Sequence, residues 1–451
     1  MNALARCLAG LLLGTVGLPA TASAAPSQPT HEFVLDNGLR VIVREDHRAP
    51  VVVSQVWYKV GSSYETPGQT GLSHALEHMM FKGSAKMGPG ESSRVLRDLG
   101  AEENAFTSDD YTAYYQVLAR DRLGVAMELE ADRMASLRLP PEEFAREIEV
   151  IKEERRMRTD DRPSAKAFEL FKAMAYPASG YHTPTIGWMA DLNRMKVEEL
   201  RHWYESWYTP DNATLVVVGD VSADEVKALA QRWFGPVPKR ITPAAKIPLE
   251  LASPGERKIT LHVRTQLPSL MYAFNVPGMA TAQKPRDVQA LRLISALLDG
   301  GYSARLSTRL ERGSETVTSA SAGYNPFVRG DSLFMLTATP NTHKKKTLAD
   351  AEQGIWGLLD ELKQKPPSAE ELERVRAQVI ASLVYDRDSI SSQASTIGML
   401  ETVGLSWKLM DTELEDLKGV TPADIQNAAR TYFTRDRLSV AHVLPEVSAH
   451  E

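Results

Sequence analysis

Alternating apolar and polar positions predict β-strands in the first part of the chain. Residues 33–43 (FVLDNGLRVIV) form two alternating segments around Asn37-Gly38, a dipeptide typical of a tight hairpin turn. Residues 51–60 predict another strand. Residues 104–117 also alternate and are rich in Thr and Tyr, which predicts a strand pair or one bent strand.

Two segments between and after these strands have helical spacing instead. The first follows Gly71, and the second begins at Pro140-Pro141 and continues to about Asp160. Proline is favoured in the first turn of a helix, where its missing N–H is not needed. Strands and helices therefore mix along the chain, which predicts an α+β fold with mainly antiparallel sheets.

A unit of amphipathic helix, turn and apolar strand occurs twice. Residues 191–218 and 416–443 align without a gap, pairing Leu192 with Leu417, Tyr208 with Phe433, Thr209 with Thr434 and Asp211 with Asp436. The repeat predicts a duplicated chain whose halves join near residues 235–254, a segment rich in Pro, Lys and Ala. We therefore expect domains at residues 25–245 and 246–451.

Length and charge limit the classes of protein that remain. The chain has 451 residues, enough for two domains with cores of their own, and a formal net charge of −6. An acidic chain lacks the positive charge that attracts nucleic acid or an anionic membrane, so neither is an expected partner. After the first 24 residues, no stretch is long and apolar enough to predict a membrane span.

Residues 1–24 have the pattern of a secretory signal peptide. Arg6 precedes an apolar run over residues 8–18, and small residues ending at Ala24 predict a cleavage site there. The only cysteine, Cys7, lies inside this segment. We therefore expect a periplasmic or secreted protein whose mature chain has no thiolate to offer a metal, so that any ligands must be His, Asp or Glu.

The candidate chemistry centres on His74-Ala-Leu-Glu77-His78. On a helix, His74 and His78 lie one above the other and can reach the same ion, and Glu77 shares their face. This spacing is the inverted form of the zinc-protease signature. The alternative is a pair of histidines that lie four apart without a metal, in a chain with 10 His.

A third ligand is expected from the second predicted helix. Catalytic zinc usually takes three protein ligands and a water, and two histidines with one carboxylate are an established set. Glu147 and Glu154 share one face with Ile148 and Ile151 close by, so both carboxylates can point inward, where they need a cation or hydrogen-bond donors. From the residues alone, the choice among Glu147, Glu153 and Glu154 stays open.

Several motifs in order resemble the pitrilysin and mitochondrial-processing-peptidase family of zinc metallopeptidases, called M16. The matching runs are His74-x-x-Glu77-His78 followed by Met-Met-Phe-Lys-Gly-Ser, Asn104-Ala105-Phe106-Thr107, Glu147-x-x-Val150-Ile151-x-x-Glu154, Tyr181-His182-Thr-Pro184-Thr-Ile-Gly187 and Tyr208-Thr-Pro210-Asp-Asn212. The resemblance covers essentially the whole chain after the predicted signal peptide. It implies two homologous α/β-sandwich domains, each a mainly antiparallel sheet flanked by helices, with the metal in the N-terminal one.

The resemblance also implies a zinc metalloendopeptidase with assigned residues. One Zn²⁺ per chain is expected on His74, His78 and Glu154, with Glu147 orienting a ligand and Glu77 activating the zinc-bound water. The peptide substrate is expected to add as a β-strand along Asn104, Ala105, Phe106 and Thr107. His182 matches a residue of a structural loop in the family, so we do not expect it to bind the metal.

The C-terminal half departs from the family pattern. Members with a complete active site carry in this half an Arg and then a Tyr that hold the substrate and stabilise the oxyanion. A gap-free alignment puts Glu311 and Thr318 at these positions, and neither residue can replace the missing donors. A shifted alignment brings Arg309 or Arg312 near the place, but the next tyrosine is then Tyr324.

These observations lead to the hypothesis of a metal-bearing subunit in a two-chain protease. The expected partner is a paralogous M16 chain that supplies the Arg and the Tyr, which would make the enzyme a heterodimer. A homodimeric peptidase with other donors is one alternative. The other is a non-catalytic peptide-binding or assembly subunit of an M16-type complex.

Overall fold

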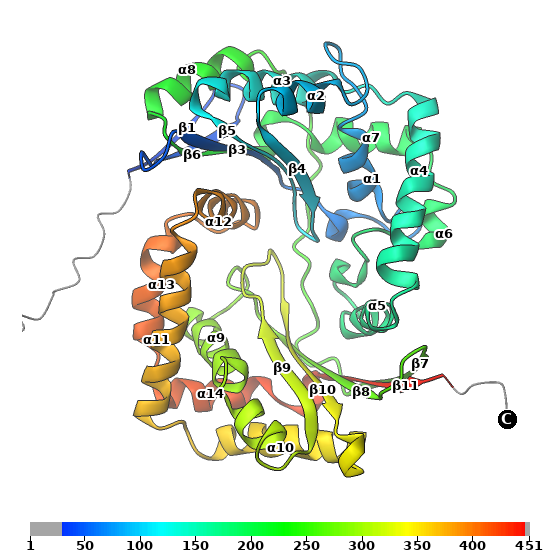
Figure 1. The fold of residues 1–451 in the computed structure, drawn as a ribbon, viewed down its shortest axis with the longest axis vertical. Helices are drawn as coiled ribbons and strands as arrows, with labels where there is room; N and C mark the ends of the chain where they lie inside the picture. The colour runs from blue at the N-terminus through cyan, green and yellow to red at the C-terminus, as the bar shows by residue number, and fades with distance from the viewer. Residues whose placement is uncertain (1–28, 447–451) are drawn as a thin grey trace, which may run out of the picture.

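The computed structural model describes residues 29–446, which form two β-sheets flanked by helices (Figure 1). The first sheet contains β1 (Thr30–Val34), β2 (Arg40–Glu45), β3 (Val51–Tyr58), β4 (Glu102–Thr107), β5 (Thr112–Ala119) and β6 (Ala213–Gly219). The second contains β7 (Arg257–Val263), β8 (Ser269–Val276), β9 (Val317–Tyr324), β10 (Ser332–Pro340) and β11 (Leu438–Pro445). The predicted signal peptide lies outside the described residues.

The strand orders are β1-β2-β6-β3-β5-β4 and β7-β11-β8-β10-β9. Among the described strands, β2 with β6 and β7 with β11 are parallel, and the other pairs are antiparallel. The predicted α+β fold with mainly antiparallel sheets is therefore confirmed.

The helices cover the faces of these sheets. In the first half they are α1 (Leu72–Met79), α2 (Glu91–Asp98), α3 (Leu123–Ser136), α4 (Pro141–Arg155), α5 (Pro163–Ala175), α6 (Met189–Leu192), α7 (Val197–Trp207) and α8 (Ala223–Trp233). In the second half they are α9 (Pro285–Asp299), α10 (Leu348–Gln364), α11 (Ala369–Asp386), α12 (Ile390–Thr402), α13 (Leu409–Lys418) and α14 (Pro422–Tyr432). Within residues 29–446, no helix combines the length and the apolar character that a membrane crossing requires.

The local elements follow the sequence pattern. The predicted hairpin is the β1–β2 pair, and Gly38 in its turn has φ +89°, a conformation that glycine adopts without strain. The predicted strand pair over residues 104–117 is the β4–β5 hairpin. The two predicted helices are α1 and α4, and α4 continues as a π-helical turn, η3 (Arg156–Asp160).

The predicted duplication is visible in the order of the strands. Strands β2-β6-β3-β5-β4 of the first sheet correspond to β7-β11-β8-β10-β9 of the second, and β1 is an additional edge strand. The repeated unit is α7 with β6 in one half and α14 with β11 in the other. Residues 235–254, where we expected the halves to join, contain neither helix nor strand. We keep residues 25–245 and 246–451 as proposed domain limits.

Each sheet buries one face under a helix from the other half of the chain. Helix α12, from the second half, lies on β3 and β6 of the first sheet, whereas α5, from the first half, lies on β7 and β11 of the second (Figure 1). The first contact joins Ile42, Val53, Trp57 and Val216 to Ala394, Ile397 and Leu400, and the second joins Leu261, Val263, Met271 and Ala441 to Ala167, Phe171 and Ala175. The two halves therefore share their cores.

Gly398 on α12 tests this exchange of helices. A methyl group at this position would overlap the indole of Trp57, whose Nε1 is fixed by a hydrogen bond to Gln55 (2.8 Å). We expect Gly398→Ala to lower the free energy of unfolding by about 1–3 kcal/mol, measured by urea denaturation, because a packed core resists an added methyl. Gly357 on α10 is the control, since its added methyl meets no atom within 4 Å.

Gly357→Ala should be neutral or stabilising by about 0.5–1 kcal/mol, because alanine is the better helix former. Equal stabilities for Gly398→Ala and the wild type would contradict the close packing of α12 on Trp57.

Candidate metal centre

The helix that carries both histidines is fixed at its start by a buried carboxylate. Gly71 precedes α1 with φ +88° and offers no side-chain cap. Glu65 takes that role, because its two oxygens accept hydrogen bonds from the N–H groups of Gly71 and Ser73, each at 2.7 Å. Burial raises the pKa of Glu65 to about 8, in spite of these hydrogen bonds. Sequence reasoning missed Glu65, although an acid shortly before a glycine-initiated helix was a signal for it.

The three predicted zinc ligands come together in the structure. Ligand atoms of His74, His78 and Glu154 lie within 4.8 Å of one another. Glu154 Oε2 is 3.3 Å from His78 Nε2 and 3.7 Å from His74 Nε2. Ligands at about 2.0–2.1 Å from a tetrahedral zinc are about 3.3 Å apart, so this spacing and the donor set of two imidazoles and one carboxylate fit Zn²⁺.

The two histidines differ in how easily they take a proton. Burial, reinforced by His78 and Arg158, lowers the pKa of His74 to about 3, so this imidazole stays neutral, as metal binding requires. Burial also opposes protonation of His78, but the hydrogen bond to Glu147 and the charge of Glu154 outweigh it and raise its pKa. Protons therefore compete with a metal mainly at His78.

Glu147 supports His78 from the side away from the other ligands. Its Oε1 lies 2.8 Å from His78 Nδ1, which leaves Nε2 facing Glu154. The other oxygen pairs with Lys82 Nζ at 2.6 Å. Burial opposes ionisation of Glu147, but the hydrogen bonds from His78 and Lys82 lower its pKa below the usual value. Such a partner fixes both the tautomer and the ring orientation of a ligand.

The structure separates the three glutamates of α4 that composition could not. Glu153 is 58% exposed and pairs with Arg156 at 2.8 Å, so it belongs to the solvated face of the helix. Glu154 faces the histidines with one oxygen, and its other oxygen pairs with Arg158 at 2.8 Å. Glu154 thus lies beside the histidines and Glu147 behind His78, and their roles as ligand and supporting residue remain predictions from the family resemblance.

Glu77 points from α1 toward β4, where it meets a threonine hydroxyl. Thr107 Oγ1 donates a hydrogen bond to Glu77 Oε2. Burial raises the pKa of Glu77, and the hydrogen bond from Thr107 partly offsets this rise. A raised pKa suits a carboxylate that must first take and later return a proton. Thr107, which we expected to contact substrate, is thus bonded to the candidate base.

The candidate ligands and Glu77 line a cleft of about 1030 Å³. Strand β4 borders it with Asn104, Ala105, Phe106 and Thr107, and it is an edge strand whose one neighbour in the sheet is β5. An extended peptide can add to such an edge. His182 also lines the cleft but is not among the three residues that converge as a metal site. Among the described residues, the lining comes entirely from positions 74–186.

The C-terminal half has no free oxyanion donor at the predicted positions. Glu311 faces β9, where its Oε1 accepts a hydrogen bond from Ala320 N at 2.9 Å, and Thr318 donates to the Thr339 carbonyl at 3.3 Å. The residues of the shifted alignment are also engaged: Arg309 with Glu361 (3.0 Å), Arg312 over the Tyr302 ring (3.5 Å to its centroid) and Tyr324 with the Pro277 carbonyl (2.6 Å).

Comparison with known proteins identifies the family to which this fold belongs. The family described as Insulinase (Peptidase family M16) matches residues 40–187, and the Peptidase M16 inactive domain matches residues 194–379. The zinc protease PqqE of Helicobacter pylori is 32% identical over 392 residues, which cover 86% of each chain. By these matches the chain belongs to the M16 family of peptidases, as its motifs indicated.

Solved structures share the fold. The crystal structure of a protease from Helicobacter pylori aligns with a TM-score of 0.86 and 26% identity, covering 93% of this chain and 100% of that one. The periplasmic protease PqqL from Escherichia coli, at 19% identity, aligns with a TM-score of 0.78, covering 93% of this chain but 48% of that chain. The same fold therefore also occurs as about half of a longer polypeptide.

Glu154 and Glu153 provide a matched pair for testing the ligand set. We expect Glu154→Gln to weaken zinc binding by more than about 100-fold, because the amide does not supply the anionic oxygen that faces both histidines. Glu153→Gln should leave the affinity within about twofold, because its side chain faces solvent. Competition with a fluorescent chelator measures both. If both variants lost zinc affinity equally, Glu154 would not be the metal ligand on this helix.

The raised pKa of His78 predicts a pH dependence of zinc binding. Zinc must displace the proton from His78, so the apparent affinity should fall as the pH drops through a value above the ordinary imidazole pKa of about 6.5. Glu147→Gln removes the main group that raises this pKa, and the fall should move to lower pH. Chelator competition from about pH 5 to about pH 8 gives the midpoint. An identical midpoint in both proteins would contradict this role of Glu147.

Proposed function

We propose that this chain is the metal-bearing subunit of a zinc-dependent endopeptidase that hydrolyses peptides or unfolded polypeptides. One observation carries the proposal: Nε2 of both histidines and Oε2 of Glu154 converge beside Glu77, in a cleft bordered by an open strand edge. Relatives such as PqqE are named zinc proteases, which supports the same activity.

Each residue of the candidate site has its own role in peptide hydrolysis. Zinc, when bound, lowers the pKa of a water and polarises the scissile carbonyl. Glu77 accepts the proton of the attacking water and later delivers it to the leaving amine, and the Thr107 hydroxyl holds its carboxylate in place. Glu147 holds His78 Nδ1 and so leaves Nε2 as the atom that would bind the metal.

The strand edge of β4 favours extended substrates. A peptide added there pairs through its main chain, so recognition depends more on backbone than on side chains. A segment in a folded protein already uses its main-chain groups and cannot pair in this way. We therefore infer a preference for flexible peptides or unfolded polypeptides.

A second chain completes the proposed enzyme. None of the described residues that line the cleft comes from the C-terminal half, and Glu311 and Thr318 stand where the family has its Arg and Tyr. We infer that a paralogous M16 chain supplies these donors to the oxyanion across the cleft. The pattern of residues 1–24 supports a periplasmic or secreted location for this complex.

Glu77→Gln tests the catalytic assignment. The amide cannot accept the proton of water, so cleavage of a flexible quenched-fluorescence peptide should fall by about 100-fold or more. Zinc content, measured by elemental analysis, should stay at one ion per chain, because Glu77 is not among the converging ligand atoms. Loss of zinc together with activity would assign Glu77 to metal binding instead.

The partner requirement is tested by assaying the purified chain alone and with the proteins that co-purify with it. We expect full activity only for the complex with the second chain. Full activity of the single chain, as monomer or homodimer, would refute the heterodimer. A zinc-loaded complex that binds peptides without cleaving them would identify a peptide-binding subunit instead.

A further inference from the structure

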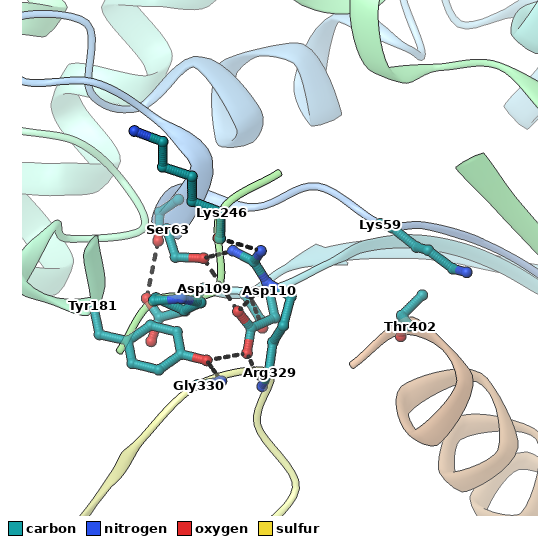
Figure 2. A network of polar contacts seen from close by, with 12 residues as sticks. Lys59, Ser63, Asp109, Asp110, Tyr181, Lys246, Arg329, Gly330 and Thr402 are labelled. Atoms are coloured by element: carbon teal, nitrogen blue, oxygen red, sulfur yellow. Dashed lines mark hydrogen bonds and ion pairs between the residues drawn. The ribbon is translucent and has the colours of Figure 1, made fainter. Parts of the chain in front are cut away.

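We propose that Arg329, in the C-terminal half, is a positioning residue for the candidate base Glu77. The proposal rests on the peptidase function proposed above. Arg329 lies in the loop between β9 and β10 and does not line the cleft. It contacts Asp110, which lies in the turn of the β4–β5 hairpin (Figure 2). Through this turn it acts on Thr107, at the end of β4.

Asp110 is a buried carboxylate that collects donors from distant parts of the chain. Its side chain is enclosed, with the residue 2% exposed. Oδ2 accepts hydrogen bonds from the Tyr181 hydroxyl at 2.6 Å and from Arg329 N at 3.0 Å. Oδ1 accepts from Ser63 Oγ at 3.1 Å and faces Arg329 Nε at 3.5 Å. A carboxylate in this setting depends on its partners, because removing one leaves buried charge uncompensated.

Arg329 also contacts other residues where the two halves meet. Its guanidinium lies 3.8 Å from the centroid of the Tyr64 ring. Nη1 donates to the Lys246 carbonyl at 2.7 Å, and Nη2 donates to Ser63 Oγ at 3.1 Å. One side chain therefore ties the hairpin turn to the 3₁₀ turn η1 (Ser62–Tyr64) and to the segment that joins the halves (Figure 2).

The same turn is held by contacts from the first half. Ser62 N and Ser63 N donate to the carbonyls of Ser108 and Asp109 at 3.1 and 2.8 Å. The Asp109 carboxylate pairs with Lys172 on α5 at 2.8 Å. The turn is thus fixed largely by its own half, and Arg329 adds the contact with Asp110 that comes from the second half.

Thr107 is the last residue of β4, directly before this turn, and pairs with Thr112 across the hairpin. A displacement of the turn therefore moves the Thr107 hydroxyl and its hydrogen bond to Glu77. Catalytic groups tolerate little misplacement, because orientation contributes strongly to rate. In this way a half that carries no metal ligand takes part in the geometry of the site.

Amide hydrogen exchange tests whether Arg329 fixes the turn of the β4–β5 hairpin, and it does not require an active enzyme. In Arg329→Met, we expect the amides of residues 102–119 to exchange at least about tenfold faster, because every guanidinium contact of Arg329 is lost and only its main-chain hydrogen bond to Asp110 remains. The control is Arg305→Met, which removes a buried guanidinium that pairs with Glu371 at 2.9 and 2.7 Å within the second half. Exchange in residues 102–119 should be unchanged there. Unchanged exchange in Arg329→Met would overturn the proposal.

Kinetics of the zinc-loaded complex test whether Arg329 affects catalysis through Thr107 and Glu77. Arg329→Met should lower kcat about tenfold with little change in KM and with zinc content retained, whereas Arg329→Lys should recover part of the loss. Thr107→Val and the double variant with Arg329→Met should have the same kcat, because Arg329 acts through Thr107. Multiplied losses in the double variant, or an unchanged kcat in Arg329→Met, would overturn the proposal.

Different results refute the peptidase activity and the positioning role of Arg329. A wild-type complex that holds zinc but cleaves no peptide refutes the proposed function itself. A wild-type complex that cleaves while Arg329→Met cleaves equally well refutes the positioning role alone.

Discussion

The two halves of this protein depend on each other because each sheet has two apolar faces. Helices of the same half cover one face, and α12 or α5 from the other half covers the second. Apolar surface of this size cannot stay exposed to water without a large cost in free energy. Helix α5 follows α4 after a short turn, so the exchange also fixes the end of the helix that carries Glu154.

The candidate metal centre combines short-range and long-range supports. Helical spacing aligns His74 and His78, whereas Glu65 fixes the start of their helix and Glu147 orients His78. The candidate base Glu77 is held by Thr107 from the neighbouring sheet edge. Buried polar groups need such partners, and each partner here also restricts the direction in which a reactive atom points.

The duplicated halves show how one fold serves two roles. The strand order of the first sheet recurs in the second, but helix α9 and its neighbours bring no group of metal ligands together among the described residues. Glu311, at the position of an expected arginine, instead binds a main-chain N–H of β9. The second half contributes helix α12, which packs on the first sheet, and the Arg329 contact with Asp110. Both support the structure of the first half and add no metal ligand among the described residues.

The sequence alone determined the features that repeat over short distances. Alternation and helical spacing predicted the β1–β2 and β4–β5 hairpins and helices α1 and α4, because these periods reflect which face of one element is buried. The motifs identified the family and predicted a set of ligand residues. The tertiary structure alone decided which half covers each sheet face, how Glu153 differs from Glu154, and that Glu65, Lys82 and Thr107 support the site. These outcomes depend on contacts between residues far apart in the chain, which local periodicity does not encode.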